Sequence, residues 1–112
     1  MDEAIVIFCT VPNEEVGSRI AEALVRDCYA ACVNILPGIT SIYQWKGRIC
    51  RDGELLLIIK TRKRLFDAAC EIIRAQHPYE VPEIIALDIK KGNEPYLRWL
   101  EEVTDEKARN ST

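Results

Sequence analysis

The spacing of apolar residues near the N-terminus predicts a strand followed by a helix. Residues 4–10 form an almost unbroken run rich in β-branched side chains that ends at Pro12-Asn13, which predicts a buried strand followed by a turn. Asn13 is a favourable N-cap, and Glu15 and Arg19 behind it have the spacing of an i,i+4 ion pair. Apolar residues then recur as in an amphipathic helix of about four turns, at Val16, Ile20, Ala23 and Leu24.

A long hairpin is expected after this helix. Residues 30–49 are rich in Val, Ile, Thr, Tyr and Trp, and we expect one strand that is kinked at Pro37-Gly38 and folds back at Lys46-Gly47. The returning strand continues through the apolar residues 55–59. Arg51-Asp52-Gly53 places turn residues where no turn is needed, which predicts a β-bulge at Gly53.

A second helix and a fourth strand follow. Thr61 is the expected N-cap of the helix, and Pro78 ends it. Residues 81–89 have the composition of a strand. The expected buried stripe of the helix consists of Leu65, Ala69, Ile72, Ile73 and Gln76.

The chain closes with a short helix. Asn93 and Pro95 open it, and residues 104–112 are a polar tail that we expect to be frayed. The predicted order is β-α-β-β-α-β plus this C-terminal helix. In a single domain spanning residues 1–112, that order predicts an α+β fold, the ferredoxin-like antiparallel sheet with two helices on one face.

The central strands are apolar on both faces. Ile5 and Ile7 point to one side of the sheet, and Val6 and Phe8 point to the other. Two helices on one face cannot cover both sides, and a bare apolar face would favour aggregation. We therefore expect self-association through the open face. The alternative is that the C-terminal helix covers that face alone.

Composition narrows the class of protein. The chain has 112 residues, of which 48% are hydrophobic and 29% charged, which fits one globular domain. The formal net charge of −3 provides no field for nucleic acid or an anionic membrane surface, and the longest uncharged stretch contains Pro37-Gly38. We therefore expect no nucleic-acid or membrane partner.

The cysteines and the N-terminus bear on location. Met1-Asp2-Glu3 lacks the positive charge of a secretory signal, so we expect the mature chain to begin there. Five cysteines are an odd number, and they lie among apolar neighbours. This pattern is typical of reduced thiols, and it predicts a cytoplasmic protein.

Catalytic motifs are scarce. The sequence has one histidine and contains no G-x-S-x-G, H-E-x-x-H or P-loop motif. An acylphosphatase would need an arginine cradle after its first strand, whereas here the acidic loop 12–15 follows. We expect a protein that is not an enzyme and has no organic cofactor.

Two long motifs indicate a family. The first runs from Cys28-Tyr29-Ala30-Ala31-Cys32-Val33-Asn34 to Gln44-Trp45-Lys46-Gly47, and the second is His77-Pro78-Tyr79-Glu80-Val81-Pro82-Glu83-Ile84. The chain closely resembles the CutA divalent-cation tolerance proteins over about nine-tenths of its length. The resemblance implies a ferredoxin-like protomer in a homotrimer similar to the PII-type signalling proteins. It also implies tolerance of copper and other divalent cations, without a settled catalytic activity.

Cys9 and His77 are the candidate metal ligands, because thiolate suits Cu(I) and imidazole suits Cu(II). Both match family positions, but copper-binding members carry a second histidine where this chain has Gln76. In the predicted topology the first strand and the second helix end at opposite ends of the sheet, so a shared site would need two subunits. The alternatives are that Cys9 is a small core residue and that His77 caps or hydrogen-bonds before Pro78.

A basic cluster is the alternative site. Arg62, Lys63 and Arg64, next to Lys60, lie at the expected start of the second helix, where free backbone N–H groups favour an anion. Salt bridges or a solvated face would also explain them. Glu80 and Glu83 could bind a hard cation or pair with these arginines.

The remaining candidates carry weaker signals. Cys28 and Cys32 have no partner pair to complete a zinc site. Cys70 lies off the expected buried stripe, so it is a candidate for a partly exposed, redox-active thiol or a partly buried one. The aromatic residues are expected at interfaces and in the core rather than on a base-stacking platform, namely Tyr43, Trp45, Tyr79, Tyr96 and Trp99.

These observations together predict a cytoplasmic homotrimer that binds a divalent metal such as Cu(II) and contributes to metal tolerance. One alternative is a PII-like signalling trimer that binds a small anionic effector between subunits, near Arg62 to Arg64, and docks onto a protein partner. Another is a structural scaffold with incidental metal affinity.

Overall fold

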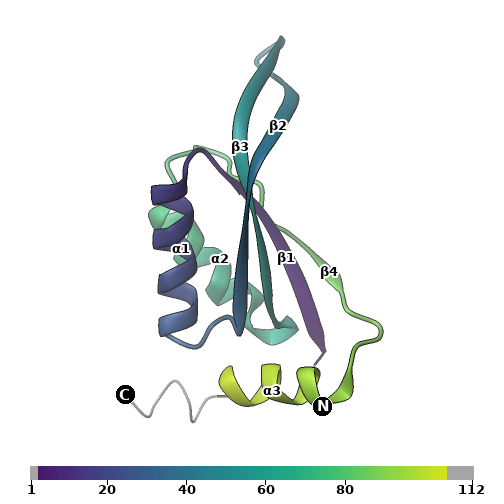
Figure 1. The fold of residues 1–112 in the computed structure, drawn as a ribbon. Coiled ribbons are helices and arrows are strands. Elements are labelled where there is room, and N and C mark those ends of the chain that lie inside the picture. The colour runs from purple at the N-terminus through teal and green to yellow at the C-terminus, as the bar shows by residue number, and fades with distance from the viewer. Residues whose placement is uncertain (1–2, 106–112) are drawn as a thin grey trace.

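The computed structural model describes residues 3–105 and has the predicted ferredoxin-like order, followed by a third helix (Figure 1). Its elements are β1 (Ala4–Val11), α1 (Glu14–Arg26), β2 (Cys32–Trp45), β3 (Arg48–Arg62), the 3-10 turn η1 (Lys63–Leu65), α2 (Phe66–Gln76), β4 (Ile85–Asp88) and α3 (Glu94–Val103). The predicted α+β class and its single antiparallel sheet are confirmed.

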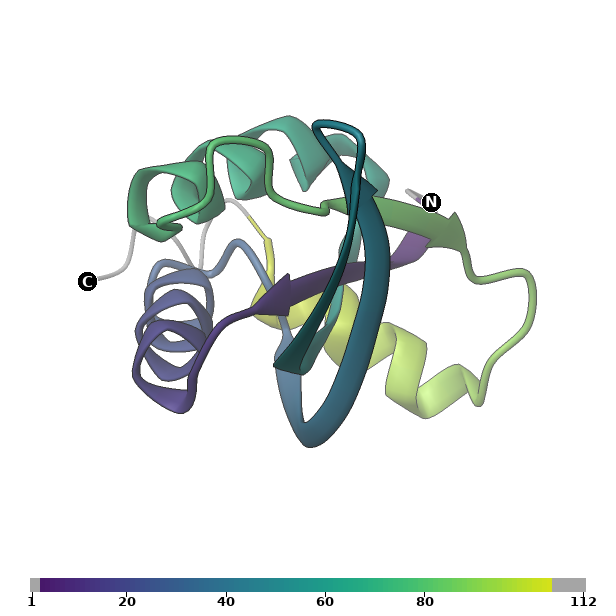
Figure 2. The ribbon, with the colours of Figure 1, turned by 90° about the horizontal axis from the view of Figure 1, so that it is seen from above.

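The four strands form one sheet in the order β2-β3-β1-β4, and every neighbouring pair is antiparallel. Helices α1 and α2 lie together on one face of it (Figure 2). The side chains that face these helices form the core because alternate residues of a strand point to the same side. On β1 and β3 these buried residues are Ile5, Ile7, Cys9, Val11, Leu57 and Ile59.

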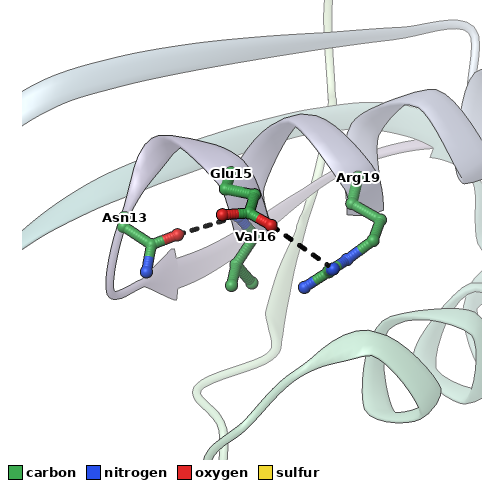
Figure 3. Close-up of polar contacts among 4 residues, drawn as sticks. All are labelled: Asn13, Glu15, Val16 and Arg19. Carbon is green, nitrogen blue, oxygen red and sulfur yellow. Dashed lines mark hydrogen bonds and ion pairs between the residues drawn. The ribbon is translucent and has the colours of Figure 1, made fainter.

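Helix α1 begins as the sequence predicts. The Asn13 side chain accepts a hydrogen bond from the Val16 N–H at 2.9 Å, which satisfies a donor that the first helical turn leaves free (Figure 3). Glu15 and Arg19 form the expected exposed ion pair at 3.9 Å. At Gly17 an added Cβ would lie 3.2 Å from a Val11 methyl group, so glycine lets α1 approach the sheet closely.

The β2–β3 hairpin turns at Lys46-Gly47, as predicted. Both residues have positive φ angles, 51° and 76°, which matches the right-handed strand twist in a two-residue turn. The bulge, however, lies in β2 between Leu36 and Ile39, and Gly53 pairs in regular register with Thr40. Predicting it at Gly53 was wrong, because the extra residue is accommodated at Gly38, whose φ is +79°.

Two further boundaries differ from prediction. Thr61 does not cap α2, because it lies inside β3 and its hydroxyl donates to the Tyr29 carbonyl at 2.7 Å. Helix α2 instead begins at Phe66 after the 3-10 turn, with no side-chain cap. The strand predicted over 81–89 is shorter, Ile85–Asp88, since Pro82 has no N–H to donate to a ladder.

Helix α3 packs across the end of the sheet opposite the hairpin (Figure 1). Leu100 anchors it, and the buried Arg62 guanidinium donates to the Thr104 hydroxyl at 3.0 Å and to the Thr104 carbonyl at 2.8 Å. Thr104 is therefore buried, which corrects the expectation that fraying begins there. Residues 106–112 of the expected frayed tail lie outside the described part of the chain.

The second face of the sheet stays largely uncovered. Three apolar residues on the face away from α1 and α2 remain exposed, namely Leu36 at 48%, Ile85 at 54% and Leu87 at 60%. The alternative that α3 alone covers this face is wrong, because the helix crosses only one end of the sheet (Figure 1). Within residues 3–105, no helix combines the length and the apolarity that crossing a membrane requires.

We predict that Asn13→Ala lowers the free energy of unfolding by about 1 kcal/mol, because the Val16 N–H loses its partner at the start of α1. Urea unfolding at fixed protein concentration measures the change. Asn13→Asp keeps the cap and should retain most of the wild-type stability. Equal midpoints for Asn13→Ala and the wild type would contradict the role of the cap.

Candidate functional site

Cys9 and His77 lie close together in one chain, contrary to the prediction from topology. Helix α2 begins just after β3 ends and runs back along the sheet. Its C-terminus therefore lies at the end of the sheet where β1 also ends (Figure 1). There His77 Nε2 lies 2.8 Å from the carbonyl oxygen of Thr10, the residue after Cys9. Placing them at opposite ends was wrong because it reversed the direction of α2.

Both ring nitrogens of His77 take part in hydrogen bonds. Nδ1 accepts from the Tyr79 N–H at 3.2 Å, so the ring proton lies on Nε2 and is donated to Thr10 O. The ring is also buried and lies 4.7 Å from the Tyr79 ring, centroid to centroid. In this arrangement His77 ties the end of α2 to β1 and leaves no nitrogen open to a ligand.

The Cys9 thiol is fully buried on the helix-facing side of β1, and it donates to the same Thr10 carbonyl at 3.7 Å. Burial raises the pKa of Cys9 to about 12, with a smaller contribution from the negative charges of Glu83 and Glu54. A metal needs the thiolate. Cys9 and His77 therefore do not form a preformed metal centre, and residues 3–105 contain no cluster of three potential metal ligands.

Arg62 and Lys63 of the predicted basic cluster contact different partners. Arg62 is buried and directs its guanidinium to Thr104, as described above. Lys63 forms an exposed ion pair with Glu3 at 3.6 Å. The structure thus does not present Arg62, Lys63 and Arg64 together as an anion site at the start of α2.

The cysteines are all free thiols, and one is placed differently from the prediction. Cys70 is buried, with 6% exposure, so placing it off the buried stripe of α2 was wrong. The buried stripe of α2 is wider than predicted, because Cys70 joins Ala69 and Ile73 beneath the helix. Burial raises the pKa of its thiol, which keeps it protonated.

A hollow of about 470 Å³ lies between the hairpin and the segment that follows α2. The side chains come from the end of β1, from both arms of the hairpin and from residues 78–83. They are Thr10, Ser41, Tyr43, Trp45, Glu54, Pro78, Tyr79, Glu80, Val81 and Glu83. We call this hollow the hairpin pocket.

Two tyrosine–carboxylate pairs shape the hairpin pocket. The Tyr79 hydroxyl donates to Glu54 at 2.7 Å, and the Tyr43 hydroxyl donates to Asp52. The hydrogen bond to Asp52 raises the pKa of Tyr43 to about 12. Burial, followed by the bond to Glu54, raises the pKa of Tyr79. Both phenols therefore stay protonated at neutral pH and hold the carboxylates in place.

Sequence reasoning missed this pocket, although it named five of the ten lining residues as candidates. Glu80 and Glu83 were expected to bind a hard cation or pair with the arginines, and Tyr43, Trp45 and Tyr79 were expected at interfaces or in the core. In the chain these three aromatic residues are exposed beside the carboxylates. Tyr96 and Trp99 instead pack against each other on α3, 5.5 Å apart. The available signal in the sequence was Tyr79 next to Glu80.

Sequence comparison finds relatives along most of the chain. The CutA1 divalent ion tolerance protein family matches residues 5–103. "Divalent-cation tolerance protein CutA" of Thermus thermophilus is 54% identical over 88% of this chain and 96% of its own length. "Protein CutA 1, chloroplastic" of Oryza sativa is 53% identical over 92% of this chain and 58% of its own. This chain therefore spans little more than half of the rice relative.

Solved structures of similar proteins have the same fold. The divalent cation tolerance protein Cut A1 from Thermus thermophilus, 53% identical, superposes with a TM-score of 0.89 over 91% of this chain and 99% of the other. CutA1 from Oryza sativa, 52% identical, gives 0.91 over 94% and 96%. The family match along nearly the whole length, these identities and the common fold lead to one conclusion: the chain belongs to the CutA1 divalent ion tolerance protein family.

Proposed function

We propose that this protein is a cytoplasmic, non-catalytic homotrimer that binds copper and contributes to divalent-cation tolerance. Its membership of the family supports the role in tolerance, since relatives that are about half identical carry that name. The uncovered apolar face of the sheet is the observation that carries the assembly. The number of three subunits comes from the family resemblance.

The open face needs a covering surface. Val6, Phe8, Leu56 and Ile58 lie at its centre, and Leu36, Ile85 and Leu87 extend it to both edge strands. A contiguous apolar surface of this kind is uncommon on a soluble monomer. A second copy of the chain offers the same surface, so association of sheets buries it without another protein.

Copper is the proposed metal, and Cys9 and His77 are its proposed ligands. They flank the Thr10 carbonyl, but binding requires Cys9 to lose its proton and His77 to give up a hydrogen bond. Copper uptake is therefore coupled to proton release and to local rearrangement. Metal binding in this proposal is a response to metal excess, because the resting chain holds both side chains in other contacts.

The anionic-effector alternative has less support. Arg62 is committed to Thr104, and Lys63 pairs with Glu3. The hairpin pocket carries the opposite charge to the one an anion requires, because Glu54, Glu80 and Glu83 line it. We therefore do not propose an anionic effector.

We predict that Leu87→Lys shifts the assembly from three chains toward one, because a charged side chain then faces the apolar surface that is buried on association. Sedimentation velocity at micromolar concentration measures the change. The control is Val25→Lys, since Val25 is a similarly exposed apolar residue on helix α1. Unchanged mass for Leu87→Lys, or equal dissociation of both variants, would argue against the open face as the interface.

We predict that the apparent copper affinity rises about tenfold per pH unit between pH 7 and pH 9, because the pKa of Cys9, about 12, lies above this range and the thiolate fraction grows with pH. Native mass spectrometry with a competing chelator, corrected for the chelator's own titration, measures the affinity.

Substitutions at the proposed ligands complete the copper test. Cys9→Ser and His77→Gln should each abolish saturable uptake, whereas Cys28→Ser, at a thiol near the surface, should leave it intact. Saturable uptake that is independent of pH, or that survives Cys9→Ser, would refute the proposed ligands while leaving the assembly untouched.

A further inference from the structure

The hairpin pocket combines negative charge with aromatic surface. Three glutamates and three aromatic rings line it, and none of its lining residues is a lysine or arginine. The rings belong to Tyr43, Trp45 and Tyr79. Carboxylates and the faces of aromatic rings both attract cations, so the two kinds of side chain favour the same class of ligand. A hollow of about 470 Å³ also has the volume of a small-molecule site.

Glu54 is the one buried residue among the three glutamates that line the pocket. It is only 7% exposed, and within residues 3–105 its one hydrogen-bond donor is the neutral Tyr79 hydroxyl. No lysine or arginine in that part of the chain forms an ion pair with it. A carboxylate removed from water without a cation is costly. A positively charged group entering the pocket would supply the missing partner.

Lys46, at the turn of the hairpin, does not supply this partner. The Lys46 ammonium lies 5.8 Å from the centroid of the Trp45 ring, at the turn, and Lys46 does not line the pocket. The contact does show that a Trp45 ring face is accessible to an ammonium group.

The pocket suits an organic cation better than a metal ion. Hard divalent cations take six or more oxygen ligands at short distances. The described residues contain no group of three acidic, histidine or cysteine side chains able to hold a metal, and three of the ten residues lining this pocket are aromatic. Aromatic walls with a buried carboxylate are instead the pattern that recognises ammonium and guanidinium groups.

We propose that the hairpin pocket binds an organic cation, whose ammonium or guanidinium group pairs with Glu54 while its apolar part rests on Tyr43, Trp45 and Tyr79. The cation has two possible sources with the same chemistry. It is either a free small amine or guanidine, or a basic side chain of a second copy of the chain. The proposal is independent of the copper site, since Cys9 and His77 do not line this pocket.

Fluorescence of Trp45 tests the first source. The chain has two tryptophans, so the full-length Trp99→Phe variant leaves Trp45 as the single reporter in the pocket. It is titrated at constant ionic strength with n-butylammonium and n-butylguanidinium. Butanoate and n-butanol serve as anionic and neutral controls. We expect a saturable change with the cations alone, and at least about tenfold weaker binding in Glu54→Gln, which removes the charge but keeps an acceptor for Tyr79.

Two further variants keep the test decisive. Glu83→Gln, at an exposed lining residue, should weaken binding by a smaller factor even if Glu54→Gln fails to fold. Glu22→Gln, on the exposed side of α1, removes the same charge away from the pocket and should change nothing.

The dissociation constant of the oligomer tests the second source, a basic side chain of another copy of the chain. If neither cation binds, but Glu54→Gln or Glu83→Gln raises the dissociation constant of the oligomer about tenfold and Glu22→Gln does not, a second copy supplies the cation. The proposal is overturned if no cation binds and these pocket variants assemble like the wild type. Equal binding of cations, butanoate and n-butanol would overturn it as well.

Discussion

The pairing of β1 with β3 at the centre of the sheet is the constraint on which the rest of the structure depends. Both strands carry apolar side chains on each face, so each face of the pair needs a surface that packs against it. Helices α1 and α2 cover one side (Figure 1). On the other side, α3 covers only one end of the sheet, and the rest of that face is open to association with another surface. Self-association in our account follows from this imbalance.

The candidate sites are neighbours at the end of the sheet where β1 ends, and one short segment, residues 77–79, contributes to both. His77 holds that segment to the Thr10 carbonyl, and Tyr79, two residues later, holds it to Glu54 on β3. The buried Cys9 thiol donates to the same Thr10 carbonyl, and Tyr79 lines the hairpin pocket. The segment 77–79 therefore contributes a side chain to each candidate site.

Local patterns in the sequence predicted most of the fold. The apolar run at residues 4–10, the cap at Asn13 and the turn at Lys46-Gly47 each depend on neighbouring residues, and the structure confirms all three. Errors arose where distant partners decide. Thr61 bonds to Tyr29 instead of capping α2, and the bulge falls in the other strand of the hairpin, at Gly38.

The sites were harder to predict for the same reason. The hairpin pocket brings together residues that lie far apart in the sequence, from Thr10 to Glu83, and its shape depends on strand register and on the path of the chain after α2.

Sedimentation equilibrium of the unmodified chain is the most direct test of the central claim that the open face is covered by other copies. The account predicts one species of three chains, about 38 kDa from the chain mass of 12.8 kDa. A stable monomer at micromolar concentration would contradict it.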